Sequence, residues 1–382
     1  MSKFIYVLLF FCLLFKANDS YAKKSGTFPK WINPRFELDV SVGSSTNPAK
    51  LNTETSGTSI DLAPLVGLDF FLSKKSLIAF ELQGQTKKYT ESAVADALNS
   101  DNYRASLSGL FLLSKRLEFG SNLDYKKNKA FTLVESITGD NNTVIKDEYS
   151  QVSIDFFTLY HFKKWDMEFG TKFSSRSYDF KQMDRGNLYL NDFDRFSFDA
   201  KFTYFKRRDL NFSFGGKFHD KFYFERPSDL ANGAPAPSVS ATANLEEKQF
   251  VVFVSSAYKW SKFKFDTKVE RVMNSDKITG ARDYGQNKLV QDLEFKFSKS
   301  FTHNLNITYS KLSYEQFLAR PMSSSGQGEK WEEDFLKFLG KSSYAYSKRL
   351  DFNFIYTYEK RKSNYTATYK EHILALGMKY TL

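Results

Sequence analysis

The stretch His372–Leu382, HILALGMKYTL, decides the fold of this chain. Apolar side chains occupy every second position: Leu374, Leu376, Met378, Tyr380 and Leu382. The positions between them hold Ile373, Ala375, Gly377, Lys379 and Thr381. A period of two is the period of a β-strand, whose successive side chains point to opposite faces. The stretch therefore predicts a strand with one lipophilic face.

This ending resembles the C-terminal assembly signal of bacterial outer-membrane β-barrels. In that family the final strand usually ends in an aromatic residue, most often Phe, whereas here the last residue is Leu382. The resemblance implies that the last strand pairs with the first, and that strands and turns make up the chain between them. It also implies an environment of outer-membrane lipid and lipopolysaccharide, and recognition of the last strand by the barrel assembly machinery.

The composition supports a membrane protein built from strands rather than helices. Charged residues make up 26% of the 382-residue chain, and the mean hydropathy is −0.47, so the mature chain does not have the composition of a helical membrane protein. Aromatic residues nevertheless reach 17%, with 40 Phe and 22 Tyr. Such an excess is typical of strands whose outward side chains face lipid and headgroups.

The N-terminus has the three parts of a secretory signal. Lys3 precedes an apolar run, Phe4–Phe15, which is too short to span a membrane as a helix, and Ser20-Tyr21-Ala22 predicts cleavage after Ala22. The only cysteine, Cys12, lies inside that run, so a disulfide or thiolate metal site is not expected. The predicted organisation is a signal peptide over 1–22, a short periplasmic segment over 23–34, and a barrel over 35–382.

The formal charge of +11 would suit nucleic-acid binding, but export argues against that partner. Lys and Arg are instead expected at strand ends, near anionic headgroups.

One unit recurs along the chain: a strand, a very short basic turn, and a second strand. The turns are Ser73–Lys75, Ser114-Lys115-Arg116, Lys163-Lys164, Lys206-Arg207-Arg208, Ser261-Lys262, Ser298–Asn304 and Ser347-Lys348-Arg349. Longer polar segments separate the hairpins: Lys126–Asp147, Asp179–Asn191, Arg226–Glu247 and Ala319–Lys330. Short turns at one end and long loops at the other are typical of outer-membrane barrels, in which the short turns are periplasmic.

The hairpins predict an all-β fold, a transmembrane antiparallel up-and-down β-barrel. Phe36–Val42 is the expected first strand and the partner of the last. Seven turns, with the first and last strands outside them, give about 16 strands. The less regular stretches Tyr103–Leu113 and Glu333–Tyr346 leave 14 or 18 possible. A soluble β-sandwich also alternates in this way, but it rarely repeats this hairpin asymmetry.

If the aromatic face of each strand meets lipid, the polar face lines the interior. The candidates for the pore lining are Glu168, Lys172, Asp199, Lys201, Lys217, Asp266, Lys268, Asp292, Glu294 and Lys296. Sixteen strands enclose a lumen wide enough for water, and the sequence has no plug domain. Charges of both signs fit two interpretations, ion-pair ladders that brace the wall or a transverse field. Lys126–Asp147 resembles, in position only, the third loop that folds into the lumen of sixteen-stranded porins.

Catalytic and metal-binding patterns are sparse. The four histidines, His161, His219, His303 and His372, have no metal-ligand spacing, and no cofactor is expected. His219-Asp220 is the one candidate pair, because barrel proteases and phospholipases use His groups. A solvated pair at the rim is the favoured interpretation, and no enzyme activity is expected.

The stretch Tyr358–Tyr365, YEKRKSNY, is similar to the closing sequence of barrels that serve polysaccharide secretion or lipoprotein display. The helical repeat domains that precede several of those barrels are missing here. The leading hypothesis is a passive, porin-like channel for small polar solutes. A structural or export-associated barrel and a barrel hydrolase are the alternatives, with the solute and the oligomeric state left open.

Overall fold

The computed structural model describes residues 31–46, 56–90, 99–135, 142–179, 182–184, 187–189, 192–227, 244–277, 282–318, 330–364 and 368–381. The first strands are β1 (Ile32–Ser45), β2 (Gly57–Ser73), β3 (Ser76–Tyr89), β4 (Ser100–Leu112), β5 (Leu117–Glu135) and β6 (Asn142–His161). Next are β7 (Trp165–Tyr178), β8 (Gln182–Asp184), β9 (Asn187–Tyr189), β10 (Phe193–Arg207), β11 (Leu210–Pro227) and β12 (Asn244–Trp260). The last are β13 (Phe263–Asp276), β14 (Tyr284–Lys296), β15 (Phe301–Leu318), β16 (Lys330–Ala345), β17 (Leu350–Ser363) and β18 (Tyr369–Thr381).

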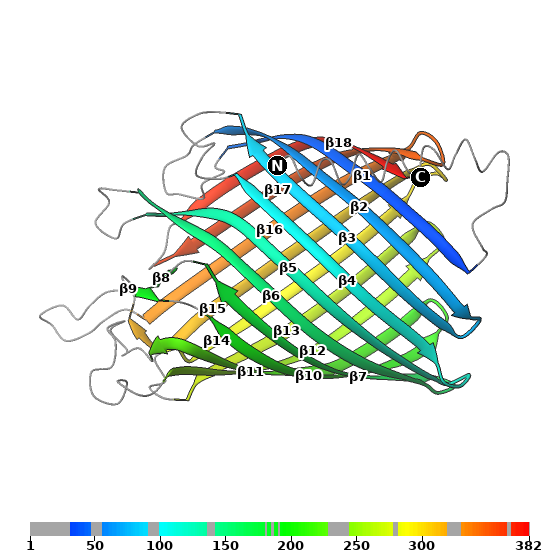
Figure 1. Ribbon diagram of the computed structural model, residues 1–382, viewed down its shortest axis with the longest axis horizontal. Coiled ribbons are helices and arrows are strands. Elements are labelled where there is room, and N and C mark those ends of the chain that lie inside the picture. The colour runs from blue at the N-terminus through cyan, green and yellow to red at the C-terminus, as the bar shows by residue number, and fades with distance from the viewer. Residues whose placement is uncertain are drawn as a thin grey trace, which may run out of the picture.

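Sixteen of these strands form one closed antiparallel barrel, in which β1 lies between β2 and β18 (Figure 1). The remaining two, β8 and β9, pair only with each other. The barrel closes through the last strand, with Val42 opposite Leu376 and Leu38 opposite Tyr380. The predicted strand number and the predicted pairing of Phe36–Val42 with the last strand are therefore confirmed.

The seven predicted turns all join neighbouring strands at one end of the barrel, on the right in Figure 1, although Phe301 to Asn304 of the predicted Ser298–Asn304 turn belong to β15. Serine hydroxyls stabilise several of them by accepting backbone N–H groups. Ser114 Oγ accepts from Arg116 and Leu117 at 3.1 Å each, and Ser347 Oγ accepts from Arg349 at 3.2 Å. This is the hydrogen bond of an ST-turn, which explains why Ser precedes Lys or Arg so often here.

The turn between β12 and β13 has only two residues, Ser261 and Lys262. Ser261 has φ = 42°, in the left-handed region. A positive φ at the first central residue is the feature of a type II′ hairpin turn, where glycine is preferred. This turn keeps a serine in a conformation that favours glycine.

At the other end of the barrel the strands run further than the sequence predicted. Lys126–Asp147 was expected to be a loop that narrows the lumen, but β5 and β6 stay paired up to Glu135 opposite Asn142. That prediction is wrong over most of its length, and residues 136–141 lie outside the described part. The strands continue because the hairpin satisfies the backbone N–H and C=O groups of both segments.

The polar segment Asp179–Asn191 contains the β8–β9 hairpin, with Met183 opposite Leu188. At the start of the barrel, β1 begins at Ile32, ahead of the predicted boundary at residue 35. Among the described residues, no helix is long and apolar enough to cross a membrane.

Candidate functional site

The two faces of the barrel wall differ sharply in chemistry. Large apolar side chains on the outer face are solvent-exposed, including Leu376 at 67%, Val254 at 59% and Phe214 at 50%. Exposed apolar area on this scale is unfavourable in water, at about 25 cal/mol for each Å², and a closed barrel leaves no unpaired strand edge within lipid. The chain is a transmembrane β-barrel. The opposite face of the same strands is the candidate site.

On β7, β10 and β11 the predicted residues share this inner face. Glu168 lies directly opposite Lys201, and Asp199 lies opposite both Gly170 and Lys217. Lys201 Nζ is 3.7 Å from Glu168 Oε2. A Cβ on Gly170 would come within 2.6 Å of Asp199 Oδ1, so glycine provides the space that this carboxylate occupies.

Ion pairs between and within strands cover the half of the wall next to the short turns. Lys172 Nζ on β7 is 3.6 Å from Asp155 on β6, and within β14 Lys296 Nζ is 3.1 Å from Glu294. Within β13, Lys264 is 2.5 Å from Asp266 and Lys268 is 2.5 Å from Glu270. Because these pairs are partly solvated, each stabilises the wall by only about 0.2–1 kcal/mol.

A hollow of about 250 Å³ lies in the wall among these groups, between β10 and β14. Its lining includes Lys201, Ser213, Ser255, Lys268 and Asp292. Asp292 Oδ1 accepts a hydrogen bond from Asn306 Nδ2 at 2.5 Å. The hollow therefore presents hydroxyls and charges of both signs to the interior.

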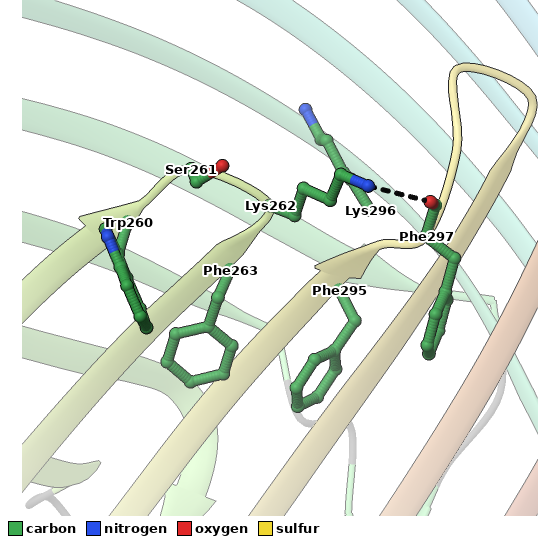
Figure 2. A pocket seen from close by; sticks show the side chains of 7 residues that line it. All are labelled: Trp260, Ser261, Lys262, Phe263, Phe295, Lys296 and Phe297. Carbon is green, nitrogen blue, oxygen red and sulfur yellow. Dashed lines mark hydrogen bonds between the residues drawn. The ribbon is translucent and has the colours of Figure 1, made fainter.

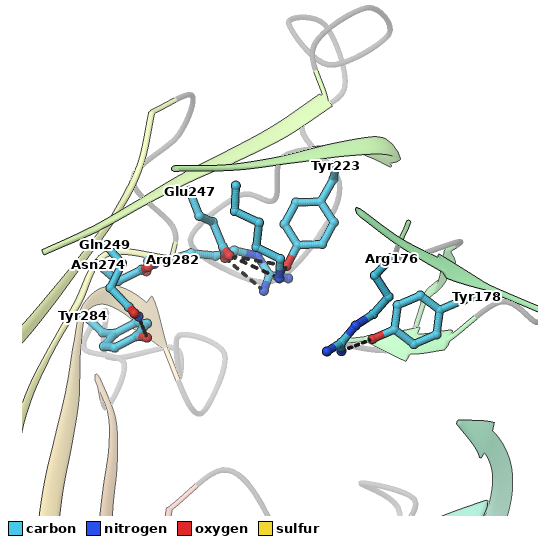
Figure 3. A network of polar contacts seen from close by, with 9 residues as sticks. Arg176, Tyr178, Tyr223, Glu247, Gln249, Asn274, Arg282 and Tyr284 are labelled. Carbon is cyan, nitrogen blue, oxygen red and sulfur yellow. Dashed lines mark hydrogen bonds and ion pairs between the residues drawn. The ribbon is translucent and has the colours of Figure 1, made fainter. Parts of the chain in front are cut away.

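The other half of the same wall carries cations and aromatic rings, of which Arg176, Tyr178, Tyr223 and Arg282 are labelled in Figure 3. We call this group the basic aromatic cluster. It consists of Tyr149, Arg176, Tyr178, Phe193, Arg195, Lys221, Tyr223, Glu247 and Arg282. Apart from Arg282, which follows β13, its members come from β6, β7, β10, β11 and β12. Phe193 and Tyr223 are only 5% and 6% exposed and pack with Leu245 and Tyr178.

Aromatic rings hold the cations of the cluster in place. The Arg176 guanidinium lies 4.1 Å from the ring centre of Tyr149 and 5.1 Å from that of Phe193. Arg176 also donates two hydrogen bonds to Gln151 Oε1, at 2.9 and 2.7 Å. Lys221 Nζ lies 4.1 Å from the Phe193 ring. Cation–π contacts of this kind contribute about 0.5–2 kcal/mol each.

One carboxylate, that of Glu247, serves several donors of the cluster. Its oxygens lie 4.0 Å from Lys221 Nζ and 3.9 Å from Arg282 Nη1, and Tyr223 Oη donates to it at 3.3 Å. Arg195 lies directly opposite Lys221. Within the basic aromatic cluster, Arg176, Arg195, Lys221 and Arg282 are cations and Glu247 is the one carboxylate, so cations are in excess there.

This cluster is not among the residues predicted from the sequence, although the sequence contains a signal for it. The pattern of Arg176 and Tyr178 continues the alternation of β7, and Phe193 and Arg195 begin that of β10. Here aromatic rings point inward rather than toward lipid, because they pack against cations. The rule that aromatic residues mark the lipid face therefore fails at this end.

The histidines lie at separate places. Asp220 points to the outer face, 3.8 Å from Lys248, whereas His219 points inward, with Nδ1 2.8 Å from Ser197 Oγ. The predicted His219–Asp220 pair is wrong, because neighbouring residues of a strand face opposite sides. At the turn end, His161 lies between Glu118 at 3.1 Å and Asp166 at 2.8 Å. Over the described residues, no group of His, Cys, Asp or Glu is placed to hold a metal ion.

A second hollow lies on the outer surface at the turn end, with a volume of about 390 Å³ (Figure 2). Trp260, Phe263, Phe295 and Phe297 line it, and Lys262 Nζ donates to the carbonyl oxygen of Phe297 at 3.4 Å. Aromatic rings beside a lysine at a strand end are typical of the membrane interface.

No protein-family model and no curated protein matches the chain. Solved structures similar to it include the anion-selective porin from Comamonas acidovorans, at 10% identity and a TM-score of 0.49, over 92% of this chain and 99% of that one. OccK1 (OpdK) of Pseudomonas aeruginosa has 6% identity and a TM-score of 0.48, over 92% and 99%. A bacterial polysaccharide outer membrane secretin has 9% identity and a TM-score of 0.46, over 91% and 97%.

Proposed function

We propose that this protein is a passive, porin-like channel for small polar solutes in the bacterial outer membrane. The observation that carries the proposal is a closed barrel of sixteen strands whose inner face is polar and charged along its length. Barrels of this size leave a water-filled interior, whereas eight strands would be filled by their own side chains.

The ten predicted pore-lining residues, Glu168 to Lys296, belong to this proposal. Their register supports it, because all lie on the face opposite to the exposed apolar side chains. The inner wall combines both arrangements that the sequence left open. Ion pairs brace the half next to the turns, and unbalanced cations gather in the other half.

The opposite side of the barrel supplies acidic groups at the cluster end. Glu359 and Glu371 lie directly opposite each other on β17 and β18, which are half-way around the barrel from β10 and β11. Glu359 contacts Lys337 at 2.5 Å, and Glu371 accepts from Ser45 at 2.7 Å. Because Lys337 balances the charge of Glu359, the field in the lumen comes mainly from the excess cations of the basic aromatic cluster, and it favours polar solutes over apolar ones.

The remaining assignments follow from the same proposal. Residues 1–22 serve as a cleaved export signal and 23–34 cover the short periplasmic segment, with residues 1–30 lying outside the described part. The last strand is the element that the barrel assembly machinery reads. The short turns face the periplasm, as in outer-membrane barrels generally.

Planar-bilayer recording tests the channel directly. Purified, folded barrels are expected to give discrete conductance steps that scale with salt concentration. Folding is checked beforehand by the strand signal in circular dichroism and by heat-dependent gel mobility. Folded barrels that leave the bilayer non-conducting at every salt concentration would contradict the proposal.

A further inference from the structure

The outer face of β17 and β18 carries a group of lysines at the end away from the short turns. Lys360, Lys362 and Lys370 all point outward and are exposed, and we call them the lysine patch. Lys360 lies directly opposite Lys370 on the neighbouring strand. Like charges in this position repel each other and destabilise a sheet.

Four other outward-facing lysines at this end have acidic partners. Each of four contacts a carboxylate oxygen: Lys88 with Asp101 at 3.6 Å, Lys127 with Asp179 at 3.7 Å, Lys248 with Asp220 at 3.8 Å, and Lys311 with Glu332 at 3.7 Å. The charges of these four lysines are therefore balanced within the sheet. They also provide matched controls at the same end of the barrel.

The patch differs because its charge is not balanced within the described residues. Asp334 is the acidic residue in register with it, opposite Lys362. Its Oδ1 accepts from the Tyr309 hydroxyl at 3.4 Å, and no patch lysine comes within 4.0 Å of a carboxylate oxygen among the described residues. Three cations thus have one carboxylate in register with them, that of Asp334, while the nearby Glu332 is engaged by Lys311.

The position of the patch indicates what neutralises it. Moving from Lys370 toward the short turns, the outward positions of β18 are His372, Leu374 and Leu376, and the two leucines belong to the exposed apolar belt. On β17, Tyr358 and Phe354 likewise follow Lys360 on the outer face in the direction of the short turns. The lysines therefore begin where the lipid-facing surface ends, at the depth of headgroups.

We propose that the lysine patch binds the phosphorylated headgroup of lipopolysaccharide, the glycolipid of the outer leaflet. Its phosphates contact Lys360, Lys362 and Lys370, and its acyl chains lie along Phe354, Leu374 and Leu376. The inference rests on the orientation proposed above, in which the end away from the short turns faces the cell exterior. A juxtamembrane Lys contributes about 1 kcal/mol of attraction to an anionic surface.

The test measures lipid binding to the full, folded barrel in detergent by native mass spectrometry. Three probes are compared: lipid A with both phosphates, lipid A with the phosphates removed, and phosphatidylglycerol. The wild-type barrel is expected to prefer phosphorylated lipid A. The K360Q/K362Q/K370Q variant should bind it about 100-fold more weakly, and K370Q alone about fivefold more weakly. The control variant K88Q/K248Q/K311Q should bind as wild type does.

Three results would overturn the proposal. These are undiminished binding by the triple variant, equal binding of dephosphorylated lipid A, and equally tight binding of phosphatidylglycerol. Single-channel conductance of the triple variant is expected to stay at the wild-type value, because the patch is outside the lumen. A wild-type barrel that binds lipid A but never conducts would contradict the proposed channel function and would still support lipid binding by the lysine patch.

Discussion

The two ends of the β7–β10–β11 wall are built from the same three strands but differ in how charge is balanced. Next to the short turns, Glu168 faces Lys201 and the wall is braced by solvated ion pairs. At the far end, Arg176 and Lys221 lie against aromatic rings and share few carboxylates.

The difference shows that alternation alone does not specify what an inner wall does. Ion pairs that cross between strands cancel their own field, so the turn end provides a rigid and nearly neutral surface. Cations held by aromatic rings keep their charge, so the far end keeps a field that solutes encounter. The following predictions test this contrast.

The largest effect is expected from the packing of the basic aromatic cluster. Phe193→Ala removes a ring that is 5% exposed and contacts both Arg176 and Lys221, and should lower the free energy of unfolding by about 3–5 kcal/mol. Urea unfolding of the barrel in lipid vesicles measures this. The lipid-facing Phe214→Ala should cost less than half as much, and equal losses would contradict the contrast.

Next in size is the effect of the cluster on ion selectivity. A charge about 6 Å from a passing ion in water contributes about 0.7 kcal/mol, or about a threefold preference. Because the same charge repels cations equally, R176Q/R195Q/K221Q should shift the permeability ratio toward cations by about tenfold for each cation that lies this close to the ion path. The reversal potential under a potassium chloride gradient reports the ratio. The neutral double change E168Q/K201Q should leave it nearly unchanged, and a comparable shift there would remove the distinction between the two ends.

The ion pair at the turn end should contribute little to stability. A double-mutant cycle with Glu168→Gln and Lys201→Gln is expected to give a coupling free energy below about 1 kcal/mol, because the pair is solvated. The coupling should fall further as salt is raised. A coupling free energy of several kcal/mol would mean that ion pairs stabilise the turn end as strongly as aromatic packing stabilises the far end.

The smallest effect concerns the β12–β13 turn. Ser261 has φ = 42°, so Ser261→Gly should relieve strain and raise the free energy of unfolding by about 0.5 kcal/mol. Ser261→Ala provides the control, since alanine keeps the Cβ and should bring no gain. Stabilisation by alanine and not by glycine would show that the backbone conformation is not what limits this turn.

Much of the fold could be predicted because its signals are local. The register of β10 follows from Phe196 to Tyr204, where a slip by one residue would move Asp199 and Lys201 into lipid, at about 2–4 kcal/mol for a buried lysine. The turns were predictable for the same reason, since the Ser114 hydroxyl accepts a hydrogen bond from the backbone of Leu117, three residues further on. The Lys126–Asp147 loop failed as a prediction because a polar segment can also continue a hairpin, whose backbone groups pair with one another.

The sequence by itself determined the architecture: strand period, turn positions, the outward and inward faces, and the pairing of the last strand with the first. These features depend on residues close to one another in the chain and on the requirement that a membrane barrel be closed. The tertiary structure decided the distribution of charge. Arg176, Lys221 and Glu247 come from different hairpins, and Lys360 lies opposite Lys370 only in the paired sheet. Because these contacts depend on strand register and on the closure of the ring, no single stretch of sequence contains them.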